Sequence, residues 1–282
     1  MSAPMRVLER FTRVTPLGIR FWDEVSARVV SDGLLVQVYA SGESERRVDA
    51  HPNGMGIFVL PRMPGPRDLA FERGDGGAAF WQQFQPRAHV MEVSDRRGYF
   101  QPFTVDQPLP VRGVGTPPCL PPIGAVPLFS TSARPVPDGM AVVRAELMYV
   151  PLQGDPVPAS WALLEVHVAG QPPAHGVADR EGRVAVIFPY PEPIANPARP
   201  MSPPYSSGQS LWDQEWPVRL EAFYDPVAPA PWIPDLCRTV TQRAAMLWAD
   251  STGTRPLPDQ TLRYGQEVIV RSSFITTAGS PP

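Results

Sequence analysis

Residues 161–189 read WALLEVHVAGQPPAHGVADREGRVAVIFP, and this stretch decides the fold. Its first eight residues are apolar except for Glu165 and His167, a composition typical of a strand. A Pro-Pro turn and an Asp-x-x-Gly turn at 179–182 follow, and a second apolar run ends at Pro189. Two short apolar runs joined by turns and stopped by proline predict paired strands.

The rest of the chain follows the same pattern, because 38 of its 282 residues are proline. Proline lacks the backbone N–H and fixes φ, so ordered elements must lie in the proline-free windows, which are mostly too short for long helices. The window 239–248 is ambiguous, since 244–247 favours helix by propensity and 239–241 favours strand. Strands are expected at residues 33–40, 56–60, 88–93, 103–105, 140–147, 161–168, 184–188, 218–224 and 267–271.

The two halves of the chain resemble each other. Residues 28–38 and 56–61 can be aligned with residues 155–168 and 182–189, each as a strand, a turn and a second strand closed by proline. This pattern resembles the carboxypeptidase-regulatory-like, transthyretin-like β-sandwich. The resemblance implies an all-β chain of two Ig-like or transthyretin-like β-sandwich domains joined by a proline-rich linker.

The predicted domain boundaries follow from these windows. We expect an N-terminal arm at 1–16, a first sandwich at 17–106, a semi-rigid proline-rich linker at 107–127, a second sandwich at 128–275 with a proline- and tryptophan-rich insertion at 189–217, and a C-terminal tail at 276–282.

Residues 126–129, 134–145 and 262–271 carry a second likeness. They are similar to accessory proteins encoded with phage-tail-like contractile injection systems. This likeness implies a structural role, with the other protein subunits of a large assembly as partners.

Composition excludes several classes of function. The chain has no lysine, so it has no P-loop lysine, Schiff base or kinase-type ATP lysine. Its net charge of −3 gives no basic stripe for nucleic acid. Arginines interrupt the first 16 residues, which predicts neither a signal peptide nor a membrane span. We therefore expect a cytoplasmic protein, unless a larger particle carries it out.

Candidate metal ligands and thiols are few. His89 and Glu92 fit a zinc-type His-x-x-Glu pair, but on a strand residues three apart point to opposite faces. His51, His167 and His175 have no third ligand at a recognisable spacing. Neither cysteine, Cys119 nor Cys237, has metal-type spacing, so free thiols are expected. The sequence predicts no catalytic residue, no metal site and no cofactor.

The tryptophans are the remaining candidates for a binding surface. Aromatic side chains on a proline-stiffened segment lose little freedom on binding a protein or the face of a sugar. The same residues could instead pack over their own sandwich. The predicted function is a non-enzymatic structural or accessory subunit that docks through sandwich edges and proline-rich arms, and the rival is a carbohydrate-binding or adhesin-like module. The candidate partner-binding residues are Tyr205, Trp212, Trp216 and Trp232.

Overall fold

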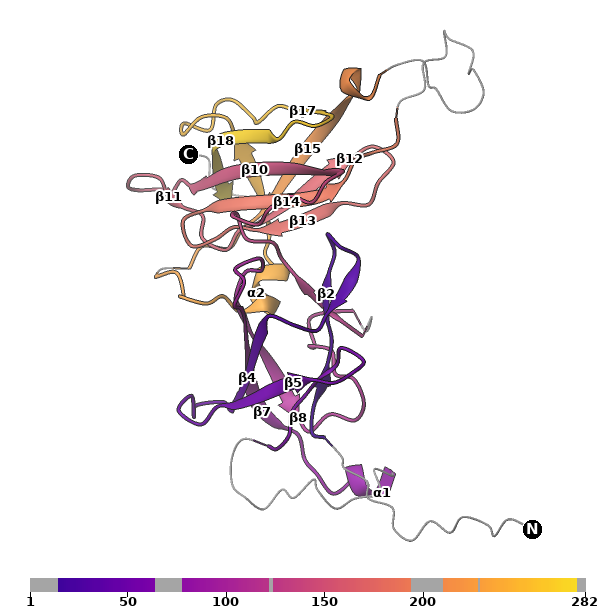
Figure 1. The fold of residues 1–282 in the computed structure, drawn as a ribbon. Coiled ribbons are helices and arrows are strands. Elements are labelled where there is room, and N and C mark those ends of the chain that lie inside the picture. Colours follow the sequence, from indigo (N-terminus) through magenta and orange to yellow (C-terminus); the bar gives the residue numbers. More distant parts are fainter. Residues whose placement is uncertain (1–14, 64–77, 122–123, 194–209, 228, 278–282) are drawn as a thin grey trace, which may run out of the picture. The chain divides into compact units, whose positions relative to one another are not determined.

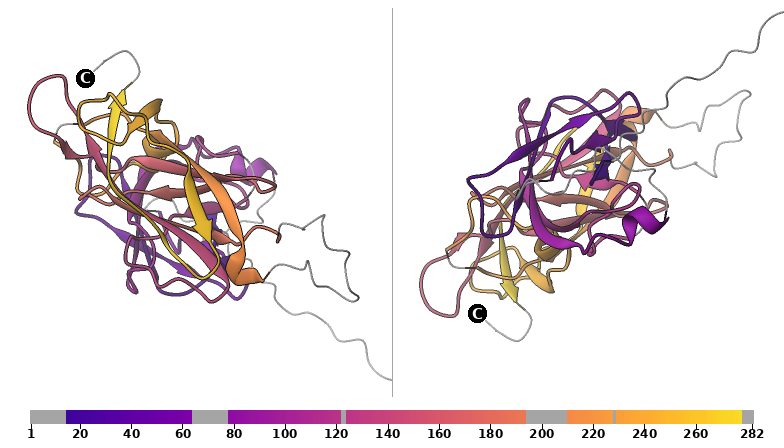
Figure 2. Two further views of the ribbon diagram at one scale, coloured as in Figure 1. Left: turned by 90° about the horizontal axis from the view of Figure 1, so that it is seen from above. Right: turned by 90° about the horizontal axis from the view of Figure 1, so that it is seen from below.

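The computed structural model describes residues 15–63, 78–121, 124–193, 210–227 and 229–277. Strands are the main regular secondary structure of this part of the chain and helices are few and short (Figures 1 and 2), so the all-β prediction is confirmed. No helix within these ranges is long and apolar enough to cross a membrane. The helices are α1 (Ala78–Trp81), η1 (Leu211–Asp213) and α2 (Leu236–Val240).

The chain divides into two compact units, each built from discontinuous segments. Unit 1 comprises residues 1–22, 29–93 and 104–126, and unit 2 comprises residues 23–28, 94–103 and 127–282. The chain passes between the units several times, whereas the sequence predicted two consecutive domains. Local sequence patterns predict strands and turns. They do not predict which core a strand joins, because that depends on packing between distant segments.

The predicted linker at 107–127 is mostly part of unit 1. Strand β8 (Phe103–Leu109) reaches into it, and Leu109 is fully buried. Further along, the N–H of Val111 donates to the carbonyl of Pro16 at 2.9 Å. Proline prevents this segment from forming a central strand, but its apolar side chains still pack, so it covers unit 1 instead of spacing two domains.

Other predicted segments lie largely outside the described residues. They are the arm at 1–16, of which 15 and 16 are described, the tail at 276–282, of which 276 and 277 end strand β18, and the insertion at 189–217, of which 194–209 are not described.

Unit 1 is organised by one six-stranded sheet. Along β4, Val36 and Val38 are buried while Gln37 between them is partly exposed, the alternation of a strand with one face on a core. Phe21 meets Phe58 edge to face, with ring centroids 5.2 Å apart. The order is β1 (Gly18–Ile19), β6 (Phe58–Val59), β5 (Val48–Pro52), β4 (Leu34–Ala40), β7 (Arg87–Asp95) and β8; a separate small sheet has the order β3 (Arg28–Val30), β2 (Phe21–Asp23) and β9 (Val126–Leu128).

Unit 2 contains a nine-stranded sheet. Strand β10 pairs in parallel with β18 and antiparallel with β14, and the other neighbouring strands of this sheet pair antiparallel. The order is β11 (Val157–Pro158), β10 (Met140–Tyr149), β18 (Val268–Thr277), β16 (Ala244–Trp248), β15 (Glu215–Phe223), β12 (Leu163–Val168) and β13 (Ala174–Val177), with β14 (Arg183–Pro189) on β10 and β17 (Gln260–Arg263) on β15.

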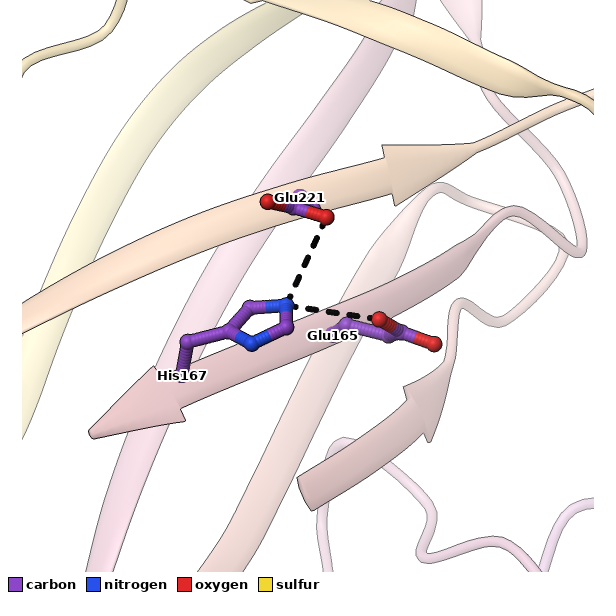
Figure 3. A group of neighbouring side chains, drawn as sticks. All are labelled: Glu165, His167 and Glu221. Carbon is purple, nitrogen blue, oxygen red and sulfur yellow. Dashed lines mark ion pairs between the residues drawn. The ribbon is translucent and has the colours of Figure 1, made fainter. Parts of the chain in front are cut away.

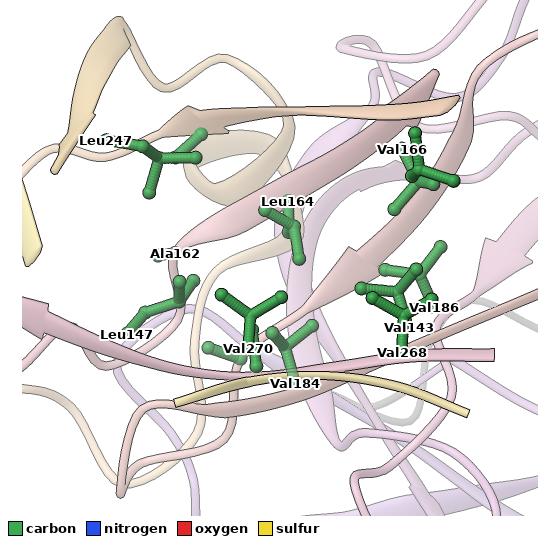
Figure 4. Packing of buried hydrophobic residues seen from close by; sticks show 14 of the residues in the cluster. Val143, Leu147, Ala162, Leu164, Val166, Val184, Val186, Leu247, Val268 and Val270 are labelled. Carbon is green, nitrogen blue, oxygen red and sulfur yellow. The ribbon is translucent and has the colours of Figure 1, made fainter. Parts of the chain in front are cut away.

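The core of unit 2 lies between the inward faces of these strands (Figure 4). Leu164 and Val166 of β12 face this core, and Glu165 and His167 point the other way. Burying each such aliphatic side chain contributes about 1.5–3 kcal/mol. The alternation read in residues 161–168 therefore reports the two faces of β12.

The Asp-x-x-Gly turn predicted between β13 and β14 is present. Asp179 Oδ1 accepts hydrogen bonds from the N–H groups of Glu181 (3.0 Å) and Arg183 (2.9 Å). Gly182 has φ +81° and its carbonyl accepts from the N–H of Leu147 at 2.8 Å. A positive φ strains any side chain, so this position suits glycine.

The ambiguous window 239–248 holds both kinds of structure. Helix α2 ends at Val240, and Asp235 caps its start by accepting from the N–H of Arg238 at 2.7 Å. Residues 244–248, which favour helix by propensity, form β16 between β15 and β18. Backbone pairing with a strand on each side outweighs a helix preference of about 0.5 kcal/mol per residue.

The expectation of free thiols is wrong. Cys119 and Cys237 are both disulfide-bonded and no cysteine is free. Neither spacing nor neighbouring residues indicated this, because a disulfide depends on the approach of two Cα atoms in space.

A buried tyrosine makes the protein sensitive to alkali. Burial, and secondarily the nearby Tyr149, raise the pKa of Tyr224 to about 12. In the unfolded chain a tyrosine ionises near pH 10, so stability is fully present below pH 10 and falls as pH rises through the folded pKa, by about 2–3 kcal/mol.

We expect a pH titration of the folded protein, followed by tyrosinate absorbance, to show one tyrosine that ionises at higher pH than the others. Tyr224→Phe should remove that component. Urea unfolding should show a smaller loss of stability above pH 10 in that variant than in the wild type. An unchanged late component in Tyr224→Phe would contradict the assignment.

Candidate functional site

The four predicted partner-binding residues have different environments. Trp212 and Trp232 are 73% and 75% exposed, whereas Trp216 is 4% exposed. Tyr205 lies outside the described residues. Trp212 lies in η1, just before β15, and Trp232 lies in the loop between β15 and α2. The predicted single aromatic surface is therefore two separate positions.

Trp232 is exposed but held in place. Arg180 lies over its ring, with the guanidinium carbon 4.7 Å from the ring centroid. The preceding residue, Pro231, accepts a hydrogen bond through its carbonyl from Trp161 Nε1 at 3.0 Å. Asp235 begins helix α2 three residues later. These contacts anchor the segment on both sides of the indole.

Trp212 ends a row of aromatic rings that leads into the core. Its ring meets Tyr264 edge to face at 5.5 Å, Tyr264 lies 4.7 Å from Tyr190, and Tyr190 lies 5.9 Å from Trp216. Gly265 allows this approach, since an added Cβ would lie 2.8 Å from the Trp212 ring.

Trp216 belongs to the core and not to a docking surface. It is part of the buried cluster of unit 2, and its Nε1 donates to the carbonyl of Glu192 at 3.2 Å. In β15 its neighbours Glu215 and Pro217 are exposed. Strand alternation, which assigns 216 to the same face as 218, was the signal that could have separated it from Trp212.

His89 and Glu92 have separate contacts in the structure. His89 is buried, with Nδ1 2.8 Å from the carbonyl oxygen of Arg87, and Glu92 pairs with Arg47 at 2.9 Å. Glu92 is the third residue after His89 in strand β7, so the two side chains lie on opposite faces of the strand, as expected.

The structure assembles a different group of ligand-type side chains that the sequence analysis missed. Glu165 and His167 of β12 and Glu221 of β15 point to the same side of the sheet (Figure 3), and their ligand atoms all lie within 4.8 Å of one another. His167 Nε2 is 3.3 Å from Glu165 Oε2 and 3.5 Å from Glu221 Oε2.

The sequence contains two signals for this group, but neither shows that the three side chains lie together. Glu165 and His167 are two apart in a strand, and Glu221 lies in a strictly alternating segment. The missing information was the register of β12 and β15, which places Glu165 opposite Glu221.

Comparison with known proteins identifies no family. No family model matches the chain, and no curated protein matches it. Among solved structures, it is similar to the TIE protein of Bacillus anthracis (TM-score 0.25, 8% identity, 93% of this chain and 34% of that one). It is also similar to GBS52, a minor pilin of Streptococcus agalactiae (TM-score 0.24, 9% identity, 94% and 99%).

The chain spans about a third of the length of the TIE protein. A third similar structure is a proposed adhesin from Bacteroides ovatus (TM-score 0.19, 10% identity, 80% and 86%). Scores at this level assign no function.

Proposed function

We propose that this protein is a non-enzymatic β-sandwich subunit that docks onto protein neighbours in a larger assembly, with Trp232 as a principal contact. The observation that carries the proposal is that Trp232 is 75% exposed and yet anchored. An exposed indole in a fixed position loses little conformational freedom when a partner covers it, and Trp and Arg are enriched among residues that dominate interface energies.

The position of Arg180 favours a protein partner over a sugar. Its guanidinium lies 4.7 Å from the Trp232 centroid and occupies one face of the ring. A pyranose would need a free ring face flanked by hydrogen-bonding groups, whereas a protein interface uses both the indole edge and the arginine. The adhesin-like or carbohydrate-binding module remains the second candidate, because Trp212 is exposed as well.

The assembly we propose is a phage-tail-like contractile injection system. The support is the likeness of residues 134–145 and 262–271, which form much of β10, β17 and the start of β18. The Asp179 to Gly182 turn between two strands likewise supports the proposed carboxypeptidase-regulatory-like character of unit 2.

We also propose that the protein functions after release as part of a particle. The disulfide-bonded state of Cys119 and Cys237 supports this location, because disulfides persist mainly in oxidising environments.

Replacement of Trp232 by alanine is expected to release the protein from its assembly. Tagged wild type and Trp232→Ala would be expressed in the source organism, and particles from lysate and medium would be sedimented and probed. The wild type should cosediment with sheath or tube components, and the variant should bind isolated particles at least about 30-fold more weakly, the loss typical of a central interface tryptophan.

Trp22→Ala is the matched control, since Trp22 is also exposed but lies in β2. Trp232→Phe should restore part of the binding. Equal sedimentation of wild type and Trp232→Ala would refute the docking role of this residue. Glycan-array binding by the wild type that Trp232→Ala or Trp212→Ala abolishes would support the carbohydrate-binding candidate instead.

A further inference from the structure

The side chains Glu165, His167 and Glu221 lie on one side of the sheet (Figure 3), the side opposite to Leu164 and Val166 of the main core of unit 2. In the sheet, Glu165 is directly opposite Glu221 on one side and His175 of β13 on the other. Two carboxylates directly opposite each other in neighbouring strands repel and destabilise a sheet. A positive group between the two carboxylates would offset this repulsion.

Each carboxylate has one oxygen engaged by a neighbour and directs the other at His167. Glu221 Oε1 is 2.9 Å from Arg219 Nη2, and Glu165 Oε1 is 3.2 Å from His175 Nε2. The remaining oxygens, Oε2 of both residues, are the ones near His167 Nε2. Arg219 and His175 thus orient the two carboxylates, as second-layer groups do around metal ligands.

His167 Nε2 has no hydrogen bond within the described part of the chain, although its solvent exposure is below 1 Å². The two glutamate oxygens are within ion-pair distance but fail the geometry of a hydrogen bond. A shielded polar atom without a hydrogen bond needs an explanation, and a bound ion is one of the usual ones.

The two separations measured from His167 Nε2 match those between metal ligands. Two ligands about 2.1 Å from a tetrahedral zinc ion are about 3.4 Å apart. The observed distances from His167 Nε2 are 3.3 Å to Glu165 Oε2 and 3.5 Å to Glu221 Oε2. One imidazole nitrogen and two carboxylate oxygens form a donor set that suits a divalent transition metal of the zinc type.

We propose that His167 Nε2, Glu165 Oε2 and Glu221 Oε2 bind a divalent transition-metal ion of the zinc type, with water completing its coordination. The ion neutralises the two opposed carboxylates and links β12 to β15. His175 is a positioning residue that holds Glu165. This site is separate from Trp232 and does not depend on the docking function.

The test uses the full chain without a histidine tag, stripped of metal with a chelator. Calorimetric titration with Zn²⁺ should show one site per chain, and Co²⁺ should give the visible absorption of a low-symmetry four- or five-coordinate ion. His167→Gln and Glu221→Gln should each weaken Zn²⁺ binding at least about tenfold, and His175→Gln should weaken it less.

His51→Gln is the matched control, because His51 is an exposed strand histidine in unit 1, and it should bind Zn²⁺ like the wild type. Zn²⁺ should raise the midpoint of thermal unfolding in the wild type and in His51→Gln, but not in His167→Gln. Circular dichroism of each variant verifies its fold. If His167→Gln fails to fold, the Zn²⁺ affinity of Glu221→Gln tests the site instead, because the Glu221 side chain is 42% exposed and its replacement should disturb the fold less.

Two results would overturn the proposal. Absence of one-to-one binding of either Zn²⁺ or Co²⁺ by the wild type would show that the two carboxylates need no metal ion between them. Binding that His167→Gln and Glu221→Gln leave unchanged would place the metal elsewhere on the chain.

Discussion

Replacing Gly182 by alanine is expected to cost about 3–5 kcal/mol of unfolding free energy, the sum of about 1–2 for a positive φ and the strain of an overlap in a packed interior. Gly182 has φ +81°, and an added Cβ would overlap the carbonyl oxygen of Leu147. That atom belongs to the backbone of β10, whose N–H at the same residue donates to the Gly182 carbonyl. The turn can relieve the overlap only by breaking its attachment to β10.

Gly170 separates the two causes. It has the same φ of +81° and nothing lies within 4 Å of the Cβ that would be added. Gly170→Ala should therefore lose only the conformational part, about 1–2 kcal/mol. Urea unfolding of both variants, with equal slopes, measures the difference. Equal losses in the two variants would show that the contact with Leu147 is unimportant.

Replacing Arg134 by methionine is expected to destabilise the protein by about 3–5 kcal/mol, because it leaves a buried carboxylate without its partner. Arg134 Nη1 and Nη2 donate to the two oxygens of Asp23 at 2.9 and 2.7 Å, and both side chains are less than a tenth exposed. Arg134 also donates to Ser130 Oγ at 3.1 Å and lies 4.9 Å from the centroid of Phe100.

The same pair predicts a dependence on pH. Burial acts to raise the pKa of Asp23, but the hydrogen bonds and charge of Arg134, with help from Ser26, outweigh it, so the pKa is lowered from 3.8. The pair therefore contributes stability above that value and loses it as pH falls through the lowered pKa. In Arg134→Met the unpaired Asp23 is easily protonated, so the gap between variant and wild type should narrow in acid.

A double variant tests whether the loss comes from the uncompensated charge. Asp23→Leu with Arg134→Met removes both charges and should recover most of the stability that Arg134→Met loses. Thermal unfolding of the wild type, both single variants and the double variant completes the cycle. A double variant as unstable as the sum of the single ones would contradict this explanation.

Strands and turns were predictable because their signals are local. Alternation along residues 161–168 reflects the two faces of one strand, and the Asp-x-x-Gly turn depends on hydrogen bonds from Asp179 to residues two and four positions later. The helix preference of residues 244–247 was misleading for the converse reason. Their conformation as β16 depends on β15 and β18, strands that pair with them from elsewhere in the chain.

The candidate sites show the same limit. In the structure, burial separates Trp216 from both Trp212 and Trp232, and the packing of Tyr190 against Trp216 and of Tyr264 against Trp212 leads from the interior indole to the exposed one. The sequence identified the tryptophans as candidates because aromatic side chains are common in interfaces. It did not show which of them are buried in the core.

The amino-acid order was sufficient for the all-β class and for the positions of most strands, because prolines end strands locally and side chains alternate along each strand. Tertiary structure alone decided the discontinuous units, the disulfide-bonded cysteines and the group formed by Glu165, His167 and Glu221. These features depend on register and on contacts between residues distant in the chain. A shift of one residue between β12 and β15 would move Glu221 to the opposite face from Glu165, and no local pattern records that register.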